Sequence, residues 1–208
     1  SGSRPSRAPR LRRLSVRTGN LFVLSGPSGA GKGTLIGLLL KRLEGAWLSV
    51  SATTRAPREG EVDGVSYLFV SDDRFDEMVA QDCLLEWAQV HDHRYGTPRD
   101  LVERHIAAGD QVFLEIDVQG ALQVRSKFPA AHLVFIAPPS MEELERRLRG
   151  RGTDSEESIR LRLANAEGEI RLKEEYDECF VNDDVDACLA SLIAYVERFS
   201  EKKEEDRL

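Results

Sequence analysis

A glycine-rich segment that contains one lysine constrains this chain more than any other feature. The sequence GPSGAGKGT (residues 26–34) follows the short apolar run at 21–24 and precedes helical periodicity over residues 32–43. This order of strand, glycine loop, lysine and helix is a P-loop. Its backbone N–H groups and the helix N-terminus surround a phosphate, and the lysine adds a full positive charge. The segment predicts an α/β fold that binds a nucleoside triphosphate. The expected phosphate ligands are Gly26, Pro27, Ser28, Gly29, Ala30, Gly31, Lys32, Gly33 and Thr34.

One position of this loop departs from the usual pattern. A serine or threonine normally follows the lysine, and its hydroxyl contacts Mg²⁺. Gly33 stands there in this chain, so Thr34 offers the nearest hydroxyl.

The rest of the chain predicts a parallel sheet with an insertion. Buried-strand runs occur at 112–116 and 132–136, and helical stretches at 140–149, 155–175 and 184–199. Strands that alternate with helices indicate a parallel sheet flanked by helices. Residues 51–100 interrupt this rhythm with short strand-like pieces at 66–70, 84–90 and 93–95. We expect them to form a small, partly antiparallel subdomain.

Charge is unevenly distributed over the 208 residues. The net charge is −7, yet residues 1–17 hold six arginines and no acid, which leaves 23 basic against 36 acidic side chains in the remainder. An acidic body argues against nucleic-acid binding, because that affinity depends on basic side chains. No apolar run reaches the length of a membrane span. We interpret residues 1–18 as a disordered basic tail, with an organelle transit peptide remnant as the alternative. Three scattered cysteines indicate reduced thiols and a cytoplasmic protein.

Two further groups of residues suggest a second anionic ligand. Arg55 and Arg58 lie three residues apart around Pro57, and two arginine forks at this spacing can hold one phosphate. Glu115 and Asp117 end a buried strand, where an acid commonly lies near the P-loop magnesium. Because they are two residues apart in a strand, we expect both side chains to point to one side of the sheet.

The chain resembles the guanylate kinases over about residues 20–200. The blocks that carry the resemblance are LSGPSGAGK (24–32), SATTRAPREGE (51–61), LEWA (85–88), YGT (95–97), EIDVQG (115–120), APPS (137–140) and RGT (151–153). The resemblance implies transfer of the γ-phosphate of ATP to GMP or dGMP with Mg²⁺. The implied fold is a P-loop core (19–50, 101–145 and 171–208), a GMP-binding subdomain (51–100) and a helical lid (146–170). We expect a monomer or a homodimer.

The resemblance also implies the roles of individual residues. The GMP phosphate would be held by Arg55, Arg58, Tyr67 and Tyr95. The guanine would be surrounded by Ser51, Glu86 and Thr97, with help from Glu115 and Asp117. The lid arginines would be Arg147, Arg151 and Arg162, which act with Lys32 and Arg58 in catalysis. Asn182 and Asp183 would lie on the adenine side of ATP, and Thr34, Glu115 and Asp117 would serve Mg²⁺, partly through water.

Guanine chemistry supports the assignment of Glu86 independently. Guanine presents N1–H and N2–H₂ side by side, and one carboxylate can accept both, whereas adenine offers an acceptor at N1. Buried polar groups that stay unpaired reject the wrong base strongly. Two alternatives stay open: an inactive guanylate-kinase-like interaction domain, and a kinase of the same fold for another phosphorylated acceptor. Which of Glu115 and Asp117 serves Mg²⁺ is also left open.

Overall fold

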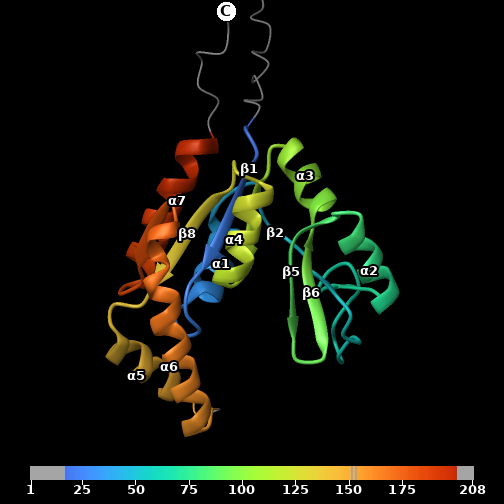
Figure 1. Ribbon diagram of the computed structural model, residues 1–208. Coiled ribbons are helices and arrows are strands. Elements are labelled where there is room, and N and C mark those ends of the chain that lie inside the picture. Colours follow the sequence, from blue (N-terminus) through green and yellow to red (C-terminus); the bar gives the residue numbers. More distant parts are fainter. Residues whose placement is uncertain (1–16, 151, 153, 201–208) are drawn as a thin grey trace, which may run out of the picture.

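A five-stranded parallel sheet forms the centre of the computed structural model, which describes residues 17–150, 152 and 154–200 (Figure 1). In spatial order its strands are β2 (Ala46–Leu48), β7 (Gln111–Glu115), β1 (Asn20–Ser25), β8 (His132–Ala137) and β9 (Glu178–Val181). All four pairings are parallel. The parallel sheet predicted from the buried apolar runs is therefore confirmed.

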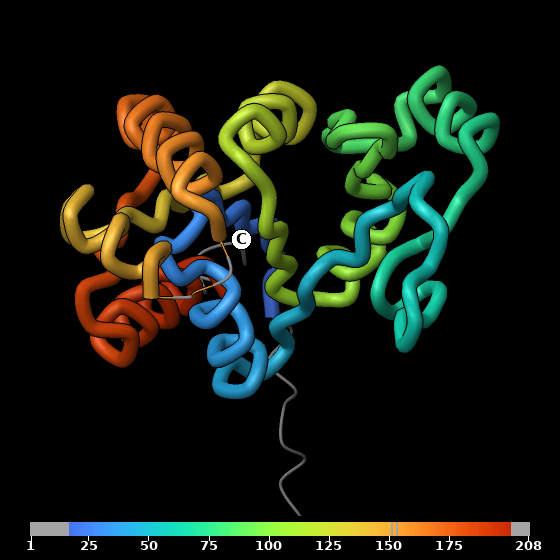
Figure 2. Tube along the Cα trace, turned by 90° about the horizontal axis from the view of Figure 1, so that it is seen from below, coloured from blue at the N-terminus to red at the C-terminus, as the bar shows by residue number. Residues whose placement is uncertain are grey.

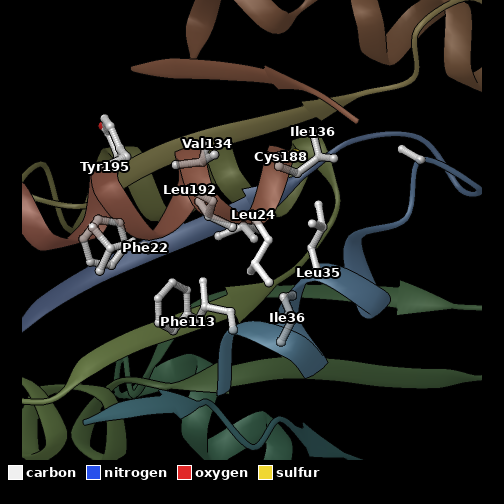
Figure 3. Packing of buried hydrophobic residues seen from close by; sticks show 14 residues of the cluster. Phe22, Leu24, Leu35, Ile36, Phe113, Val134, Ile136, Cys188, Leu192 and Tyr195 are labelled. Atoms are coloured by element: carbon white, nitrogen blue, oxygen red, sulfur yellow. The ribbon is translucent and has the colours of Figure 1, made fainter. Parts of the chain in front are cut away.

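Helices cover both faces of this sheet. They are α1 (Lys32–Arg42) and α7 (Val185–Ser200) on one face, and α3 (Arg99–Ala107) and α4 (Val118–Lys127) on the other. Phe22 and Leu24 of β1 pack toward α1 and α7, as Figure 3 shows, whereas Leu21 and Val23 pack toward α3 and α4. Successive side chains of a strand alternate between faces. A continuous apolar run such as β1 is therefore what a strand covered on both sides requires.

Residues 52–98 contain a second, four-stranded sheet. Its strands, in spatial order, are β4 (Leu68–Phe69), β3 (Ala52–Thr53), β6 (His93–Pro98) and β5 (Leu84–Val90). β6 pairs antiparallel with both β3 and β5, and β3 pairs parallel with β4. Helix α2 (Asp72–Ala80) covers this sheet and places Phe75 and Met78 against it.

Two helices, α5 (Met141–Gly150) and α6 (Glu156–Arg171), form a separate pair. Leu144 and Leu148 of α5 pack against Ile159 and Ala166 of α6. The helix predicted over 155–175 ends at residue 171. Leu172 leaves the helical path to pack beside Phe135, and the 3₁₀ turn η1 (Lys173–Glu175) follows.

The arrangement of these parts places α4 in the middle of the molecule. In Figure 2 the yellow-green α4 lies between the orange α6 and the green strands of the second sheet. The described helices include none that combines the length and the hydrophobicity of a transmembrane span.

Candidate active site

The P-loop conformation depends on glycine at two positions. A Cβ on Gly26 would lie 2.1 Å from the carbonyl oxygen of Ile136. Gly31 caps the N-terminus of α1 with a φ of +93°, and a Cβ there would lie 2.3 Å from Nδ2 of Asn182. No larger residue fits either position without moving backbone or buried side chains. The close packing fixes the loop between β1 and α1.

A cavity of about 580 Å³ opens over this loop. It is lined by Gly26, Ser28, Gly29, Gly31, Lys32, Gly33, Thr34, Glu115, Ile116, Asp117 and Glu169. The ammonium of Lys32 donates to the carbonyl oxygens of Gly26 and Pro27, so it lies at the rim of the loop. Pro27 and Ala30 of the same loop are buried and do not line the cavity. The structure thus brings the predicted loop residues and the acidic pair to one place.

Glu115 and Asp117 reach this cavity from different elements. β7 ends at Glu115, and Asp117 is the N-cap of α4, where its Oδ1 accepts from the N–H of Gly120 at 2.8 Å. The expectation that both side chains share one face of a strand was wrong, because the strand ends before Asp117. They meet at the cavity because the turn from β7 into α4 passes its edge.

Glu169 of α6 also lines this cavity, and sequence reasoning missed it. Burial raises the pKa of its carboxyl, the charge of Asp117 acts in the same direction, and Lys32 opposes both. In a chain with 36 acidic residues, no pattern distinguishes this glutamate from its neighbours on the helix.

Glu86 and Thr97 form a buried pair in the second sheet. The Thr97 hydroxyl donates to Oε1 of Glu86 at 2.6 Å, and both residues are buried. Burial raises the pKa of Glu86, and the hydrogen bond from Thr97 partly offsets the rise. A Cβ built on Gly120 would lie 3.1 Å from Oε2 of Glu86 and 3.4 Å from Oδ1 of Asp117, so the two carboxylates lie close together, and the charge of Asp117 raises the pKa of Glu86 further. A buried carboxylate with one remaining oxygen is suited to accept hydrogen bonds from a ligand.

Arg55 lies in a cluster of charged and aromatic groups. Its guanidinium binds both carboxylate oxygens of Glu61, at 2.8 and 3.0 Å. The guanidinium carbon is 5.3 Å from the ring centre of Tyr67, and the rings of Tyr67 and Tyr95 meet edge to face. Glu61 raises the pKa of Arg55, and Arg55 lowers that of Glu61. Sequence reasoning missed Glu61, although it ends the block that carries both arginines.

Two more predicted acceptor residues lie beside this cluster. The side chain of Arg58 is exposed, and its backbone N–H donates to Oε2 of Glu61 at 2.8 Å. Ser51 precedes β3, and its carbonyl oxygen accepts from the N–H of Leu68. Glu61 therefore contacts both arginines that were predicted to hold a phosphate.

The lid arginines differ in what they contact. Arg162 of α6 donates to the Ser28 hydroxyl of the P-loop at 2.5 Å and lies 3.3 Å from Asp154. Arg147 of α5 donates to the carbonyl oxygen of Asn182 at 2.9 Å and to Glu143. Arg151 lies outside the described residues. The hydrogen bond to Ser28 places Arg162 at the phosphate loop already.

Arg146 and Arg149, by contrast, are bound to neighbouring carboxylates of the lid. Arg146 pairs with Glu143, and Arg149 pairs with Glu145 and Glu156. Both arginines are exposed to a greater extent than Arg147.

Asn182 follows β9 and supports the loop from behind. Its side chain is buried and donates to the carbonyl oxygen of Ala30 at 2.8 Å. The backbone carbonyl oxygen of Asn182 accepts from the guanidinium of Arg147. Asp183, the next residue, is exposed. Asn182 thus connects the P-loop to the base of the lid.

Comparison with known proteins shows that this chain is similar to guanylate kinases. The model of the guanylate kinase family matches residues 18–199. The chain is 56% identical over 182 residues to a guanylate kinase of Synechococcus sp. (strain CC9902), covering 88% of this chain and 97% of that protein. It is 48% identical over 191 residues to one of Caldanaerobacter subterraneus subsp. tengcongensis, covering 92% of each chain.

A solved structure of a guanylate kinase is also similar to this protein in fold. The crystal structure of guanylate kinase from Anaplasma phagocytophilum superposes with a TM-score of 0.68 at 33% identity, over 90% of this chain and 89% of that one. A family match over nearly the whole chain, relatives aligned almost from end to end and a shared fold show that this chain belongs to the guanylate kinase family.

Proposed function

We propose that this protein, an enzyme of the nucleoside monophosphate kinase type, transfers the γ-phosphate of ATP to GMP or dGMP. The observation that carries the proposal is the buried Glu86–Thr97 pair, held in the second sheet while the P-loop cavity lies in the core. A P-loop alone serves many kinds of triphosphate enzyme. A buried carboxylate that can still accept two hydrogen bonds favours guanine, which presents two adjacent donors.

Guanine recognition would use the two adjacent donors of the base. Oε1 of Glu86 already accepts from Thr97, so the carboxylate is fixed in orientation and can accept from N1–H and N2–H₂. Adenine would place its N1 acceptor against the same carboxylate and leave both groups unpaired. Ser51, which precedes the adjacent strand β3, completes this side of the proposed site.

The GMP phosphate would be held by the Arg55 cluster. Glu61 accepts from both Nη atoms of Arg55, and the carbonyl oxygen of Ala56 also accepts from Nη1. The guanidinium has five donors, so its Nε–H and the second hydrogen of Nη2 would serve a phosphate. The Arg58 side chain and the hydroxyls of Tyr67 and Tyr95 would add to them. Two arginines and two phenols suit a dianion better than a neutral ligand.

The transfer itself would rest on positioning and charge. The attacking oxygen of GMP is already an anion, so no general base is required. Lys32 and the arginines Arg58, Arg147, Arg151 and Arg162 would stabilise charge that spreads over the transferring group. Arg162 supports this role, because it lies within hydrogen-bond distance of Ser28 in the loop.

The donor set at the cavity fits Mg²⁺. Thr34, Glu115 and Asp117 offer only hard oxygen ligands, and the described residues contain no cluster of three metal-binding side chains. A protein shell of one or two carboxylates suits Mg²⁺, which keeps several waters and binds substrate phosphates. When bound, the ion would neutralise phosphate charge.

We assign the two carboxylates different tasks. Glu115 lies nearest Gly33 of the loop, so we propose that it serves the metal. Asp117 Oδ1 and Glu86 Oε2 both lie beside Gly120, so we propose that Asp117 faces the acceptor nucleotide.

The adenine of ATP would lie near the segment after β9. Asn182 and Asp183 follow that strand, next to Gly31 of the loop.

The three cysteines carry free thiols, which supports a reducing compartment such as the cytoplasm.

A coupled assay that measures ADP release with ATP and each nucleoside monophosphate tests the proposal. We expect GMP and dGMP to be used and AMP, CMP and UMP to be used at least about 100-fold less well. Glu86→Ala should remove GMP phosphorylation while ATP still binds, and Glu59→Ala, a change of an exposed glutamate, should not. ADP release with none of the acceptors would favour an interaction domain, and a preference for another acceptor would overturn the guanine assignment.

A further inference from the structure

The side-chain amide of Gln123 binds the backbone of the strand that carries Glu86. Oε1 of Gln123 accepts from the N–H of Trp87 at 3.1 Å, and Nε2 donates to the Trp87 carbonyl oxygen at 3.1 Å. β5 is the edge strand of the second sheet, so its outer backbone groups have no partner strand. A carboxamide has the same donor and acceptor as a peptide group. Gln123 thus replaces a neighbouring strand at this one residue.

The strand needs such support because it is irregular at this point. The register between β5 and β6 shifts between Leu84 and Trp87, so the ladder is interrupted where Glu86 lies. A bulge redirects a side chain and leaves local backbone groups outside the ladder. The direction of the Glu86 carboxylate therefore depends on whatever holds the ends of the bulge.

Helix α4 holds both ends. Lys127, one helical turn after Gln123, donates to the carbonyl oxygen of Leu84 at 2.9 Å and to Asp82 at 2.7 Å. Residues four apart lie on the same side of a helix. Gln123 and Lys127 thus bind the strand immediately after and immediately before the irregular stretch.

The same helix approaches the Glu86 carboxylate closely. A Cβ on Gly120 would lie 3.1 Å from Oε2 of Glu86, the carboxylate oxygen that Thr97 does not bind. With any other residue at position 120, this oxygen would have to move away from its present position. The N-cap of this helix, Asp117, lines the cavity at the P-loop. In Figure 2, α4 lies between α6 and the second sheet.

We propose that Gln123 is a positioning residue for base recognition, which fixes the bulge so that Glu86 accepts both guanine donors. This inference rests on the proposed function. In this role Gln123 acts through Glu86 and does not itself bind the nucleotide. Its effect is to limit the orientations of Glu86, with Gly120 and Lys127 as the neighbouring parts of the same support.

The test compares GMP with IMP, whose base keeps N1–H and lacks the 2-amino group. A well-placed Glu86 gains the second hydrogen bond only with GMP, so the ratio of kcat/KM for GMP to that for IMP reports its orientation. The ratio is independent of the fraction of folded enzyme, which removes stability from the comparison. Gln123→Met is nearly isosteric and removes both hydrogen bonds. Arg125→Met changes the same helix, where Arg125 contacts Asp177 and Ala131 of the core.

We expect Gln123→Met to lower the GMP to IMP ratio about 10-fold, since a small misplacement of a recognising group has a large effect. Gly120→Ala should lower this ratio as well. In Arg125→Met the ratio should stay within about 2-fold of the parent value, and in all three variants the KM for ATP should stay within about 2-fold of the parent value. A ratio unchanged in Gln123→Met would overturn the inference and leave the proposed function intact. A parent enzyme that does not use GMP, or that does not prefer GMP to IMP, would overturn the guanine assignment and the inference with it.

Discussion

The guanidinium of Arg55 and the carboxylate of Glu61 meet at two points, with N–O distances of 2.8 and 3.0 Å, in the loop proposed to bind the GMP phosphate. The same carboxylate accepts from the backbone of Arg58. One acidic residue thus fixes the segment that carries both arginines. It either prepares the site for a phosphate or competes with the phosphate, and the free donors of Arg55 favour preparation.

Glu61→Ala distinguishes these two effects. We expect the KM for GMP to rise about 10-fold, because the guanidinium loses its fixed orientation, and the KM for ATP to stay within about 2-fold. Steady-state kinetics with each substrate varied in turn measures both values, and Glu59→Ala is the matched control. A lower KM for GMP in Glu61→Ala would show competition instead.

Thr97→Val should move the acid limb of the pH profile for GMP. Burial raises the pKa of Glu86, and its carboxylate must be ionised to accept both guanine donors. Catalytic efficiency with GMP should therefore fall as pH falls through this raised pKa. The Thr97 hydroxyl stabilises the ionised form, so its removal raises the pKa further.

The measurement is kcat/KM for GMP against pH in the parent and in Thr97→Val. The acid limb should shift to higher pH in the variant, while the KM for ATP keeps its pH dependence. An acid limb at the same pH in both proteins would mean that another group controls it.

Arg162→Ala should lower kcat about 100-fold, because the loss of one preorganised cation at a phosphoryl-transfer site typically has an effect of this size. Arg160, two residues earlier on α6, is exposed, and Arg160→Ala should stay within about 2-fold of the parent. Single-turnover kinetics with saturating ATP and GMP compares them. Equal rates for the two variants would remove Arg162 from the proposed catalytic set.

Gly33→Ser should be tolerated and should reduce the magnesium requirement. A Cβ at Gly33 lies 3.8 Å from Oε1 of Glu115, an ordinary contact, and residue 33 is in a helix with no positive φ. The added hydroxyl would lie where a P-loop normally offers one to the metal. We expect the Mg²⁺ concentration for half-maximal rate to fall about 2- to 5-fold at fixed ATP. An unchanged or higher requirement would argue that Glu115 and Thr34 do not face the ion.

The sequence predicted the core better than the site. β1, β7 and β8 are apolar runs long enough to identify, and the P-loop has a fixed pattern. Helix α4 was not predicted as an element, because Gly120 and its polar residues weaken the helical periodicity. Its bonds to β5 depend on two segments that lie 36 residues apart meeting in space. No local pattern contains that information.

The acidic residues illustrate the same limit. Glu86 could be assigned a role because it lies in a recognisable block and because guanine chemistry requires a carboxylate. The neighbours of Glu61 and Glu169 depend on the fold. Glu61 binds Arg55, and Glu169 lines the P-loop cavity. The error on Asp117 has a related origin, since where β7 ends determines which element orients that side chain.

The two contacts of Asn182 have a mechanical consequence. Its side-chain amide donates to the carbonyl oxygen of Ala30 in the P-loop, and its backbone carbonyl oxygen accepts from Arg147 of α5. Arg147 lies in the last turn of α5, so this end of the helix is connected to the loop proposed to bind phosphate. A motion that carries α5 away from the loop would therefore have to break the hydrogen bond between Arg147 and the backbone of Asn182.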